Sequence, residues 1–354
     1  MSRADGRAVP ALRWGPVGVR IRPRGLAAAA IVLAVLLAVT AYSLFTGPLA
    51  LTADRVLAAL TGSGSDVEAL VVSRRLTRAT AAVVIGAALG CSGALTQTIT
   101  RNPIASPDVL GVTAGASVFA VLVTVRPEVV EAVVGVPAQS VVGVATVLGG
   151  LLTAGLLVAL SRRGGFDGFR LVLVGIGVNA FALAVVAWLL TRAEIESAAV
   201  AQRWLTGSLE GVTAADVLAA TVVTVPGLLA CVVLADRLGA LRLGREVAAS
   251  LGVRTGRAEG AALLVAVVLA SAATAVVGPV AFVAFVAPQI ALRAFRTAGP
   301  PPVAGAAVGS ALLLAADTVA QSLPQPLPVG ILTSVVGAPF LLYLVTRTLR
   351  RTRA

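Results

Sequence analysis

The sequence has 354 residues, of which 58% are hydrophobic and 12% charged, with a formal net charge of +12 and a mean hydropathy of +0.98. These values exclude a soluble globular domain and are typical of a chain embedded in a bilayer. Because a helix needs roughly 20 apolar residues to cross the hydrocarbon core, the length allows about ten spans with short connections. We therefore predict one membrane domain and no separate soluble domain.

All 28 basic residues are Arg, and the sequence contains neither Lys nor His. A phosphate-binding P-loop uses a Lys in the pattern GxxxxGK[ST], so the chain has no such ATPase site of its own. The absence of His excludes His-based zinc sites, haem ligation by His and Ser/His catalytic relays. We predict a chain with no catalytic residues, no metal site and no cofactor of its own, so any ATP must be hydrolysed by a partner.

Apolar runs bounded by charged or Pro/Gly-rich segments predict the spans. The first run is too long for the apolar core of a signal peptide, and we interpret it as a retained span. The eighth run follows Gly278-Pro279 and is short, so we expect a kinked or tilted helix that its neighbours bury. The ten predicted spans are residues 26–46, 79–99, 109–125, 138–160, 170–190, 214–235, 260–277, 279–292, 303–322 and 329–346.

The arginines indicate how the spans are oriented. With both termini on one side, 21 arginines fall in segments on that side and 7 on the other. Basic residues are enriched in cytoplasmic connections, so we predict a multi-pass protein of the cytoplasmic (inner) membrane with both termini in the cytoplasm. The predicted domain is residues 26–347, between a basic tail (1–25) and a short C-terminal tail (348–354). Basic loops that face anionic lipid account for the net charge without nucleic acid.

The second predicted span and the turn after it form the most informative window. Gly86, Gly90 and Gly93 recur at helical spacing, and such small residues allow helices to approach closely in lipid. Arg101-Asn102-Pro103 breaks the helix, and Asp108 lies near the start of the next one, where a negative charge suits the helix dipole. On their own, these residues indicate only a tightly packed bundle.

The longest predicted cytoplasmic connection, residues 236–260, contains the segment LGREVAASLGV. Its apolar residues Leu243, Val247, Ala248 and Leu251 fall at helical spacing and would form one apolar face against a partner. An ordinary solvated connector fits the composition equally well.

Two polar residues lie within predicted spans. Asp317 is near the outer end of the ninth span; ionisable residues in a bilayer are costly and usually face a cavity or a partner, but helix packing is an equally good explanation. Asn179, on the fifth span, either lines a pathway or forms a hydrogen bond between helices. Asp317 is nearly alone as a carboxylate at membrane depth. This argues against one functional class for a chain with many spans, the ion-coupled secondary transporters.

Several longer segments occur in a characteristic order. Arg75-x-x-Arg78 leads into GAALGCSGALTQ and RNPIASPDVLGVTAGA, and these are followed by WLTGSL, LGREVAASLGV, GPVAFVAFVAP, LLLAADTVAQ and LPVGILTSVVGAPFLLYLV. Together they resemble the permeases of the FecCD type, which import iron siderophores, haem and vitamin B12. The resemblance covers residues from about 30 to 347.

The resemblance implies a type II ABC importer permease, an all-α polytopic membrane protein with ten helices. It implies a homo- or heterodimer around a central pathway, two ATPase subunits in the cytoplasm that bind ATP and Mg, and an extracytoplasmic substrate-binding protein. It also implies that the segment within 236–260 couples the permease to the ATPase. The implied coupling residues are Leu243, Gly244, Ala248, Leu251 and Gly252.

At the outer side, the resemblance implies that Arg75 and Arg78 receive acidic residues of the binding protein, because exposed arginines bind carboxylates in a bidentate manner. The alternative is that they anchor the helix to lipid headgroups. Candidates for the pathway or for helix packing are Gln97, Asn102, Pro103, Asn179 and Asp317.

The chain departs from the family pattern at a few positions. Gln321 stands where relatives often have Arg, Pro288-Gln289 where they have Pro-His, and Pro326 where they have an acidic residue. Such departures fit one half of a heterodimer whose partner keeps the usual residues. The predicted function is import of iron–siderophore complexes by alternating access at a dimer interface, with haem or cobalamin as alternative cargo.

Overall fold

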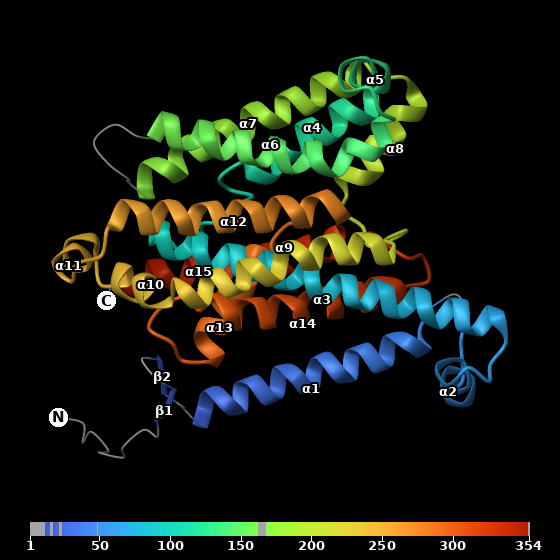
Figure 1. Cartoon of the computed structure of the whole chain (residues 1–354), viewed down its shortest axis with the longest axis horizontal. Helices are drawn as coiled ribbons and strands as arrows, with labels where there is room; N and C mark the ends of the chain where they lie inside the picture. The colour runs from blue at the N-terminus through green and yellow to red at the C-terminus, as the bar shows by residue number, and fades with distance from the viewer. Residues whose placement is uncertain (1–10, 15–16, 21–22, 48, 162–167, 353–354) are drawn as a thin grey trace.

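The computed structural model describes residues 11–14, 17–20, 23–47, 49–161 and 168–352, and within these ranges the chain is almost wholly helical (Figure 1). The strands among them form one short antiparallel hairpin, β1 (Ala11–Trp14) with β2 (Val17–Arg20), inside the predicted basic tail. The remaining residues of that tail up to Arg22, and the loop residues Arg162 and Arg163, lie outside the described residues. The predicted all-α membrane fold is confirmed.

Each of the ten predicted spans coincides with a helix. Among the described residues, seven helices are long and apolar enough to cross a membrane, whereas α4, α13 and the apolar part of α15 are shorter. The helices are α1 (Pro23–Phe45), α3 (Asp66–Thr100), α4 (Val112–Val125), α6 (Ala138–Ser161), α7 (Gly168–Thr191), α9 (Ala214–Val233), α12 (Thr255–Val277), α13 (Val283–Ala294), α14 (Pro302–Ser322) and α15 (Val329–Thr352).

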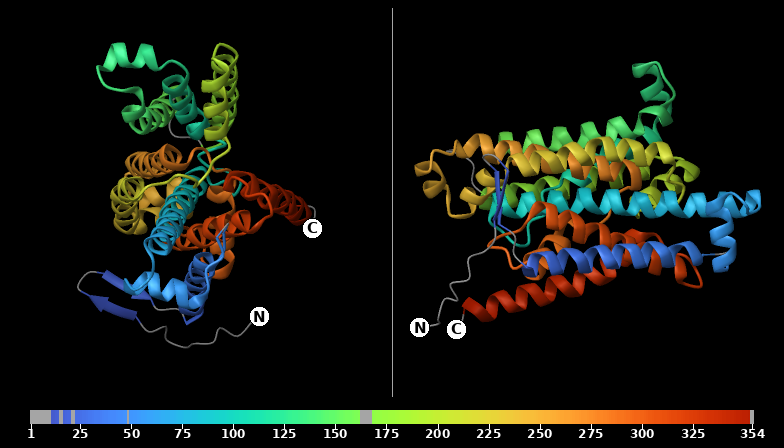
Figure 2. Two further views of the ribbon diagram at one scale, coloured as in Figure 1. Left: turned by 90° about the vertical axis from the view of Figure 1, so that its right-hand side faces the viewer. Right: turned by 60° about the horizontal axis from the view of Figure 1, so that its bottom comes forward.

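Five shorter helices of the described chain lie at the two ends of the bundle (Figures 1 and 2). At one end, the α5 end, are α2 (Ala53–Thr61), α5 (Pro127–Val134) and α8 (Ile195–Leu205). At the other, the α11 end, are α10 (Ala235–Arg242) and α11 (Arg245–Ser250), together with the start of α1. The described connections therefore alternate between the two ends as the arginine distribution predicts.

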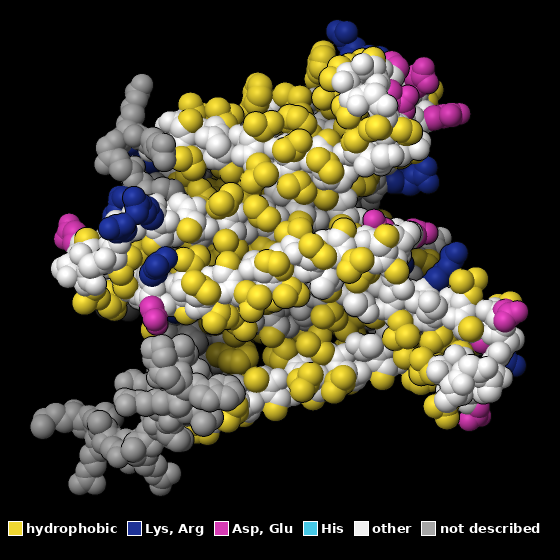
Figure 3. Space-filling model, viewed as in Figure 1, with side chains coloured by type: hydrophobic (Ala, Val, Ile, Leu, Met, Phe, Trp, Pro, Cys, Tyr) yellow, Lys and Arg dark blue, Asp and Glu magenta, His cyan; other side chains and the backbone are white. Residues whose placement is uncertain are grey.

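Side-chain chemistry varies along the bundle in the same way. Figure 3 shows hydrophobic side chains over the middle of the visible face, with Arg, Asp and Glu gathered toward its two ends. Many large apolar side chains on the long helices are exposed, among them Ile31, Leu152, Phe181 and Leu229. Exposed apolar side chains of this kind are expected on helices whose outer surface contacts lipid.

Helix α3 lies at the centre of the bundle, in contact with α9, α12, α13 and α14. Every residue from Ala88 to Thr100 is buried. A Cβ atom on Gly90 would overlap the carbonyl oxygen of Gly305 in α14, and one on Gly93 would overlap that of Ala284 in α13. Small residues thus bring these backbones into direct contact, as the spacing of the glycines predicts.

The structure corrects the predicted start of this helix. The prediction placed it at residue 79, but α3 begins at Asp66 and is capped by Ser65, whose side chain accepts a hydrogen bond from the Glu68 amide while Glu68 accepts one from the Ser65 amide. This reciprocal cap is a strong helix start signal, but the first turns are polar and escape a search for apolar runs. Arg75 and Arg78, predicted to lie in an outer connection, are therefore within α3.

The predicted eighth span starts later than expected. Residues 278–281 are not helical, and Phe282, which caps α13, has a left-handed backbone with φ of 68°. Beside this stretch, the Ser208 amide donates to the Val277 carbonyl (2.8 Å) and the Gly330 amide donates to the Gly207 carbonyl (3.0 Å). Non-helical backbone inside a membrane bundle requires such internal partners, and the packing also buries most of α13 as predicted.

Candidate functional site

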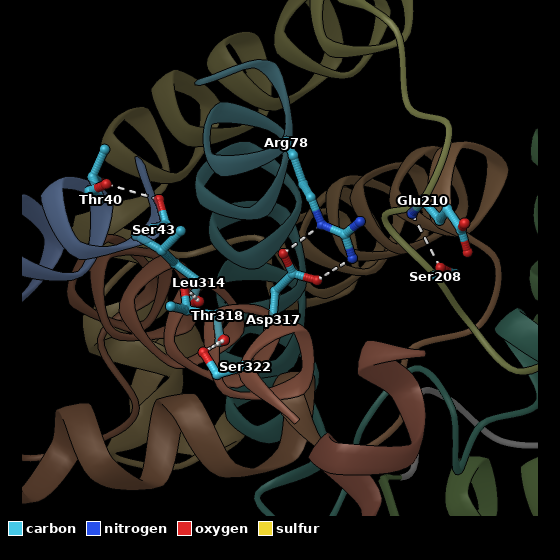
Figure 4. A network of polar contacts seen from close by, with 9 residues as sticks. All are labelled: Thr40, Ser43, Arg78, Ser208, Glu210, Leu314, Asp317, Thr318 and Ser322. Carbon is cyan, nitrogen blue, oxygen red and sulfur yellow. Dashed lines mark hydrogen bonds and ion pairs between the residues drawn. The ribbon is translucent and has the colours of Figure 1, made fainter. Parts of the chain in front are cut away.

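An ion pair joins two central helices toward the α5 end. The guanidinium of Arg78 on α3 contacts both carboxylate oxygens of Asp317 on α14, with Nε–Oδ2 and Nη2–Oδ1 distances of 2.7 and 2.8 Å (Figure 4). The Asp317 side chain is 5% exposed and that of Arg78 21%. Two parallel charge-assisted hydrogen bonds hold the two helices together at this point, so Asp317 takes part in helix packing.

Arg75, one turn earlier on α3, is held in a different way. Its guanidinium donates hydrogen bonds to the carbonyl oxygens of Leu44, at the end of α1, and Leu49, in the connection to α2. It therefore ties the end of the first span to the central helix. Both arginines implied as docking residues thus have partners within the chain.

A third arginine lies beside them. Arg74 is exposed and has no ion-pair partner among the described residues. A cavity of about 370 Å³ opens between α1, α3 and α14, and its lining includes all three arginines together with Asp317 and Gln321. The sequence search missed Arg74 because only the Arg-x-x-Arg spacing was recognised.

Two glutamines connect α3 with α13 deeper in the bundle. The Gln97 side-chain amide donates to the Phe285 carbonyl (3.0 Å), and that of Gln289 donates to the Gln97 side-chain oxygen (2.8 Å). Each residue is 2% exposed. Buried amides satisfied in this way hold helices in a fixed register. Gln289, noted in the sequence only as a departure, is therefore a packing partner of Gln97.

The other candidates lie apart from these groups. Asn102 shapes the turn after α3, where its side-chain oxygen accepts a hydrogen bond from the Ile104 amide (3.1 Å), and Pro103 is exposed in the same turn. Asn179 is half-buried on α7, and its backbone contacts Gly111 before α4. No described interaction brings these residues to Gln97 or Asp317.

Asp108 is the titratable group of this turn with the strongest electrostatic perturbation. Burial raises the pKa of its carboxyl to about 6, against a smaller opposing effect from a hydrogen bond with Thr113. A raised pKa means that this carboxyl keeps its proton up to a higher pH than an ordinary Asp does.

The predicted coupling segment forms α10 and α11 at the α11 end. Gly244 (φ 118°) is the N-cap of α11 and Gly252 (φ 82°) follows the helix, and both φ values disfavour any side chain. Leu243, Val247 and Leu251 are 65%, 44% and 63% exposed. The segment therefore presents a surface of three apolar side chains, which we call the α11 apolar surface.

Ala248 differs from the sequence expectation, which grouped it with these residues on one face. It is fully buried and contacts Leu241 and Ala258 of the same chain. The helix is anchored further by Arg245, whose Nη2 lies 3.4 Å from a carboxylate oxygen of Glu259, a buried residue of α12. The apolar positions thus separate into an inward anchor and an outward surface.

Comparison with known proteins gives a consistent picture. The profile of the FecCD transport family matches residues 35–347. The ferric enterobactin transport system permease protein of Escherichia coli K12 is 38% identical, over 88% of this chain and 92% of its own length. The cobalamin import system permease protein of Halobacterium salinarum is 36% identical, over 80% of this chain and 75% of its own length.

A solved structure shares the fold. It is an inward-facing ABC transporter that has been assigned to the metal-chelate type, and it superposes with a TM-score of 0.76 at 24% identity. The match covers 91% of this chain and 99% of the other. The helix arrangement described above is thus also found in a transporter.

Proposed function

The chain belongs to the FecCD transport family, and from that premise we propose that it is the membrane-spanning subunit of an ATP-driven importer of iron–siderophore complexes. The similarity to the ferric enterobactin permease extends over 92% of that protein's length, and it supports a ferric siderophore as the cargo. Haem and cobalamin are the alternative cargoes within the family, and the similarity to a cobalamin permease supports cobalamin as an alternative.

The observation that carries the proposal is the α11 apolar surface. Leu243, Val247 and Leu251 are exposed at the end of the bundle where the arginines are concentrated, and no described part of the chain covers them. The chain has no Lys for a P-loop, so ATP must be hydrolysed by another subunit. We assign the surface to a groove of that ATPase, with Gly244, Gly252 and the buried Ala248 holding α11 in position.

The arginine distribution also supports an orientation. Because basic residues are enriched on the cytoplasmic side, the α11 end faces the cytoplasm and the α5 end the extracytoplasmic side. In the proposed arrangement, two ATPase subunits lie below a permease dimer and a substrate-binding protein lies above it, in the cytoplasmic membrane. Both chain termini are then cytoplasmic.

At the extracytoplasmic side, the cavity with three arginines is the proposed contact for the binding protein. Arg75 and Arg78 remain docking candidates, but a carboxylate from the partner would have to share them with Leu44, Leu49 and Asp317. Arg74 is exposed without an ion-pair partner in the described chain, so it offers its full donor set. We therefore add it as the main docking residue.

The proposed mechanism has no covalent step in this subunit. A loaded binding protein docks at the α5 end, ATP binding closes the ATPase pair at the α11 end, and α11 transmits that movement to the helices. The pathway lies at the dimer interface, with Asn179 as a lining candidate. Gln97, Asn102 and Pro103 support the helices around it.

Uptake in proteoliposomes tests the proposal. The chain is reconstituted with its ATPase, its second permease subunit and its binding protein, and radiolabelled ferric siderophore is supplied outside. We expect accumulation that requires hydrolysable ATP and is not reduced by excess haemin or cobalamin. Uptake that proceeds with a non-hydrolysable ATP analogue would overturn the ATP-driven mechanism, and competition by either alternative would reassign the cargo.

A further inference from the structure

A groove of about 910 Å³ lies between α1, α13, α14 and α15. Figure 2 shows α15 projecting from the bundle, with α1 on the same side of α14. The volume is at the upper end of the range for ligand pockets, roughly 300–1,000 Å³. Nothing in the proposed transport mechanism uses this groove.

The lining of the groove is apolar over almost its whole length. Ile31, Val286, Leu312 and Val336 are among the side chains that form it, contributed by all four helices. Thr333 lines it too, but its hydroxyl already donates to the Gly330 carbonyl (3.1 Å). An occupant must therefore be apolar along its body, because the walls offer a polar chelate almost no hydrogen-bond partner.

The exceptions are two arginines. Arg24 is in the first turn of α1 and Arg296 follows α13, so both belong to the α11 end, where each is exposed. Within the described chain, neither guanidinium has an ion-pair partner. The groove thus combines an apolar body with a cationic end at the level of a membrane surface.

We propose that this groove binds an anionic phospholipid of the cytoplasmic leaflet, with its acyl chains along the apolar walls and its phosphate at Arg24 and Arg296. Basic pockets between spanning helices on the cytoplasmic side are suited to anionic headgroups, and guanidinium groups bind phosphate in a bidentate manner. Among the described helices, α15 packs mainly against α13 and α14. The lipid therefore supplies further packing contacts for α15.

Charge complementarity favours a lipid over a second copy of the chain. A helix of another copy in the groove would cover both guanidinium groups, and the described acidic residues at the α11 end are few, namely Asp108, Asp236, Glu246 and Glu259. A phospholipid supplies both the long apolar body and the anion. The proposal does not depend on the cargo or on the ATPase.

Native mass spectrometry of the full-length chain, purified in detergent in its own oligomeric state, tests this. Phosphatidylglycerol and phosphatidylcholine with the same acyl chains are titrated against the protein and against Arg24→Gln/Arg296→Gln. We expect phosphatidylglycerol to bind more tightly, and its affinity to fall about fivefold for each arginine removed, as for basic residues near an anionic membrane surface. Phosphatidylcholine binding should barely change.

Two further variants locate the site. Arg237→Gln removes an exposed arginine of α10 that does not line the groove, and it should leave lipid binding unchanged. Ala315→Phe fills part of the apolar wall and should weaken both lipids. Equal affinity for the two lipids, an equal loss in Arg237→Gln, or phosphatidylglycerol bound to monomers but absent from dimers would overturn the proposal, the last result indicating that a second copy covers the groove.

Discussion

The bidentate contact between Arg78 and Asp317 shows why two charges are tolerated inside a membrane bundle. Each group satisfies the other at 2.7 and 2.8 Å, so neither is left as an isolated charge. Removing one member of a buried pair is far more damaging than removing both, because the remaining charge stays desolvated. The pair is therefore a coupled unit, and single substitutions will overstate its net contribution to stability.

Arg78→Leu should lower the thermal midpoint of the purified chain markedly, corresponding to about 3 kcal/mol, the low end of the cost of breaking a buried pair. The low end applies because Arg78 is 21% exposed. The double variant Arg78→Leu/Asp317→Leu should recover most of that loss. Arg74→Leu serves as the control and should leave the midpoint unchanged; a double variant as unstable as the single one would argue against the coupling.

The pKa of Asp108 predicts a pH dependence. Since burial raises this pKa from its ordinary value near 3.8 to about 6, the folded chain binds the proton more tightly than the unfolded chain. The favourable contribution is present below pH 4 and is lost as the pH rises through 6. Asp108→Asn should therefore melt at a higher temperature than the unmodified chain at pH 8 and at a similar temperature at pH 4, with the exposed Asp236→Asn as control. A constant difference across pH would contradict this.

Among the elements, α3 is defined by its contacts at Gly86, Gly90 and Gly93. Gly93→Ala places a Cβ atom against the Ala284 carbonyl, which belongs to backbone and has little room to move. We expect a loss of at least about 1–3 kcal/mol, as for other overpacked sites, measured as a lower thermal midpoint and a smaller yield of monodisperse protein. Gly143→Ala and Gly155→Ala on α6, where an added Cβ atom would meet no atom of another element within 4 Å, should have little effect.

Helix α11 offers a paired test on adjacent residues. Val247→Asp changes an exposed side chain of the α11 apolar surface, so the permease should fold normally but bind its ATPase at least about tenfold more weakly, as at an interface hot spot. Ala248→Asp instead buries a charge against Leu241 and Ala258 and should destabilise the permease itself. Thermal unfolding and co-purification with the ATPase separate the two effects. Equal co-purification of Val247→Asp and the unmodified chain would remove α11 from the interface.

For the whole molecule, the proposed orientation can be measured with thiol chemistry. Both native cysteines, Cys91 and Cys231, are buried and should not react. Glu128→Cys on α5 should be labelled by a membrane-impermeant maleimide in intact spheroplasts, whereas Glu246→Cys on α11 should be labelled only after lysis, since both positions are exposed at opposite ends. The reverse pattern would invert the proposed topology.

Much of this architecture follows from the sequence because two simple quantities set it. Apolar length predicts ten helices, and arginine placement predicts which ends lie together. The helix starts were less well predicted: the polar first turns of α3 and the non-helical residues before α13 carry no apolar signal, although Ser65 and Glu68 form a recognisable cap. A search for capping pairs would have found the first of these.

The sites divide along a similar line. The exposed Leu243 and Leu251 were predictable from spacing, but the burial of Ala248 was not. A helix of six residues is too short for its periodicity to indicate which face packs against the rest of the chain. The pairing of Arg78 with Asp317 joins residues far apart in sequence, and only the three-dimensional contact of α3 with α14 reveals it. The lipid groove is likewise a property of four helices together.

The backbone contact between α3 and α14 has a mechanical consequence. Gly86 and Gly90 on one helix meet Gly309 and Gly305 on the other, and the Arg78–Asp317 pair joins the same two helices toward the α5 end. Two helices in direct backbone contact cannot slide past each other without breaking that contact. Densely packed protein interiors change between discrete packing arrangements and do not deform continuously. We therefore expect α3 and α14 to move together as one rigid unit across the membrane, so that conformational changes during transport occur in the helices packed around them.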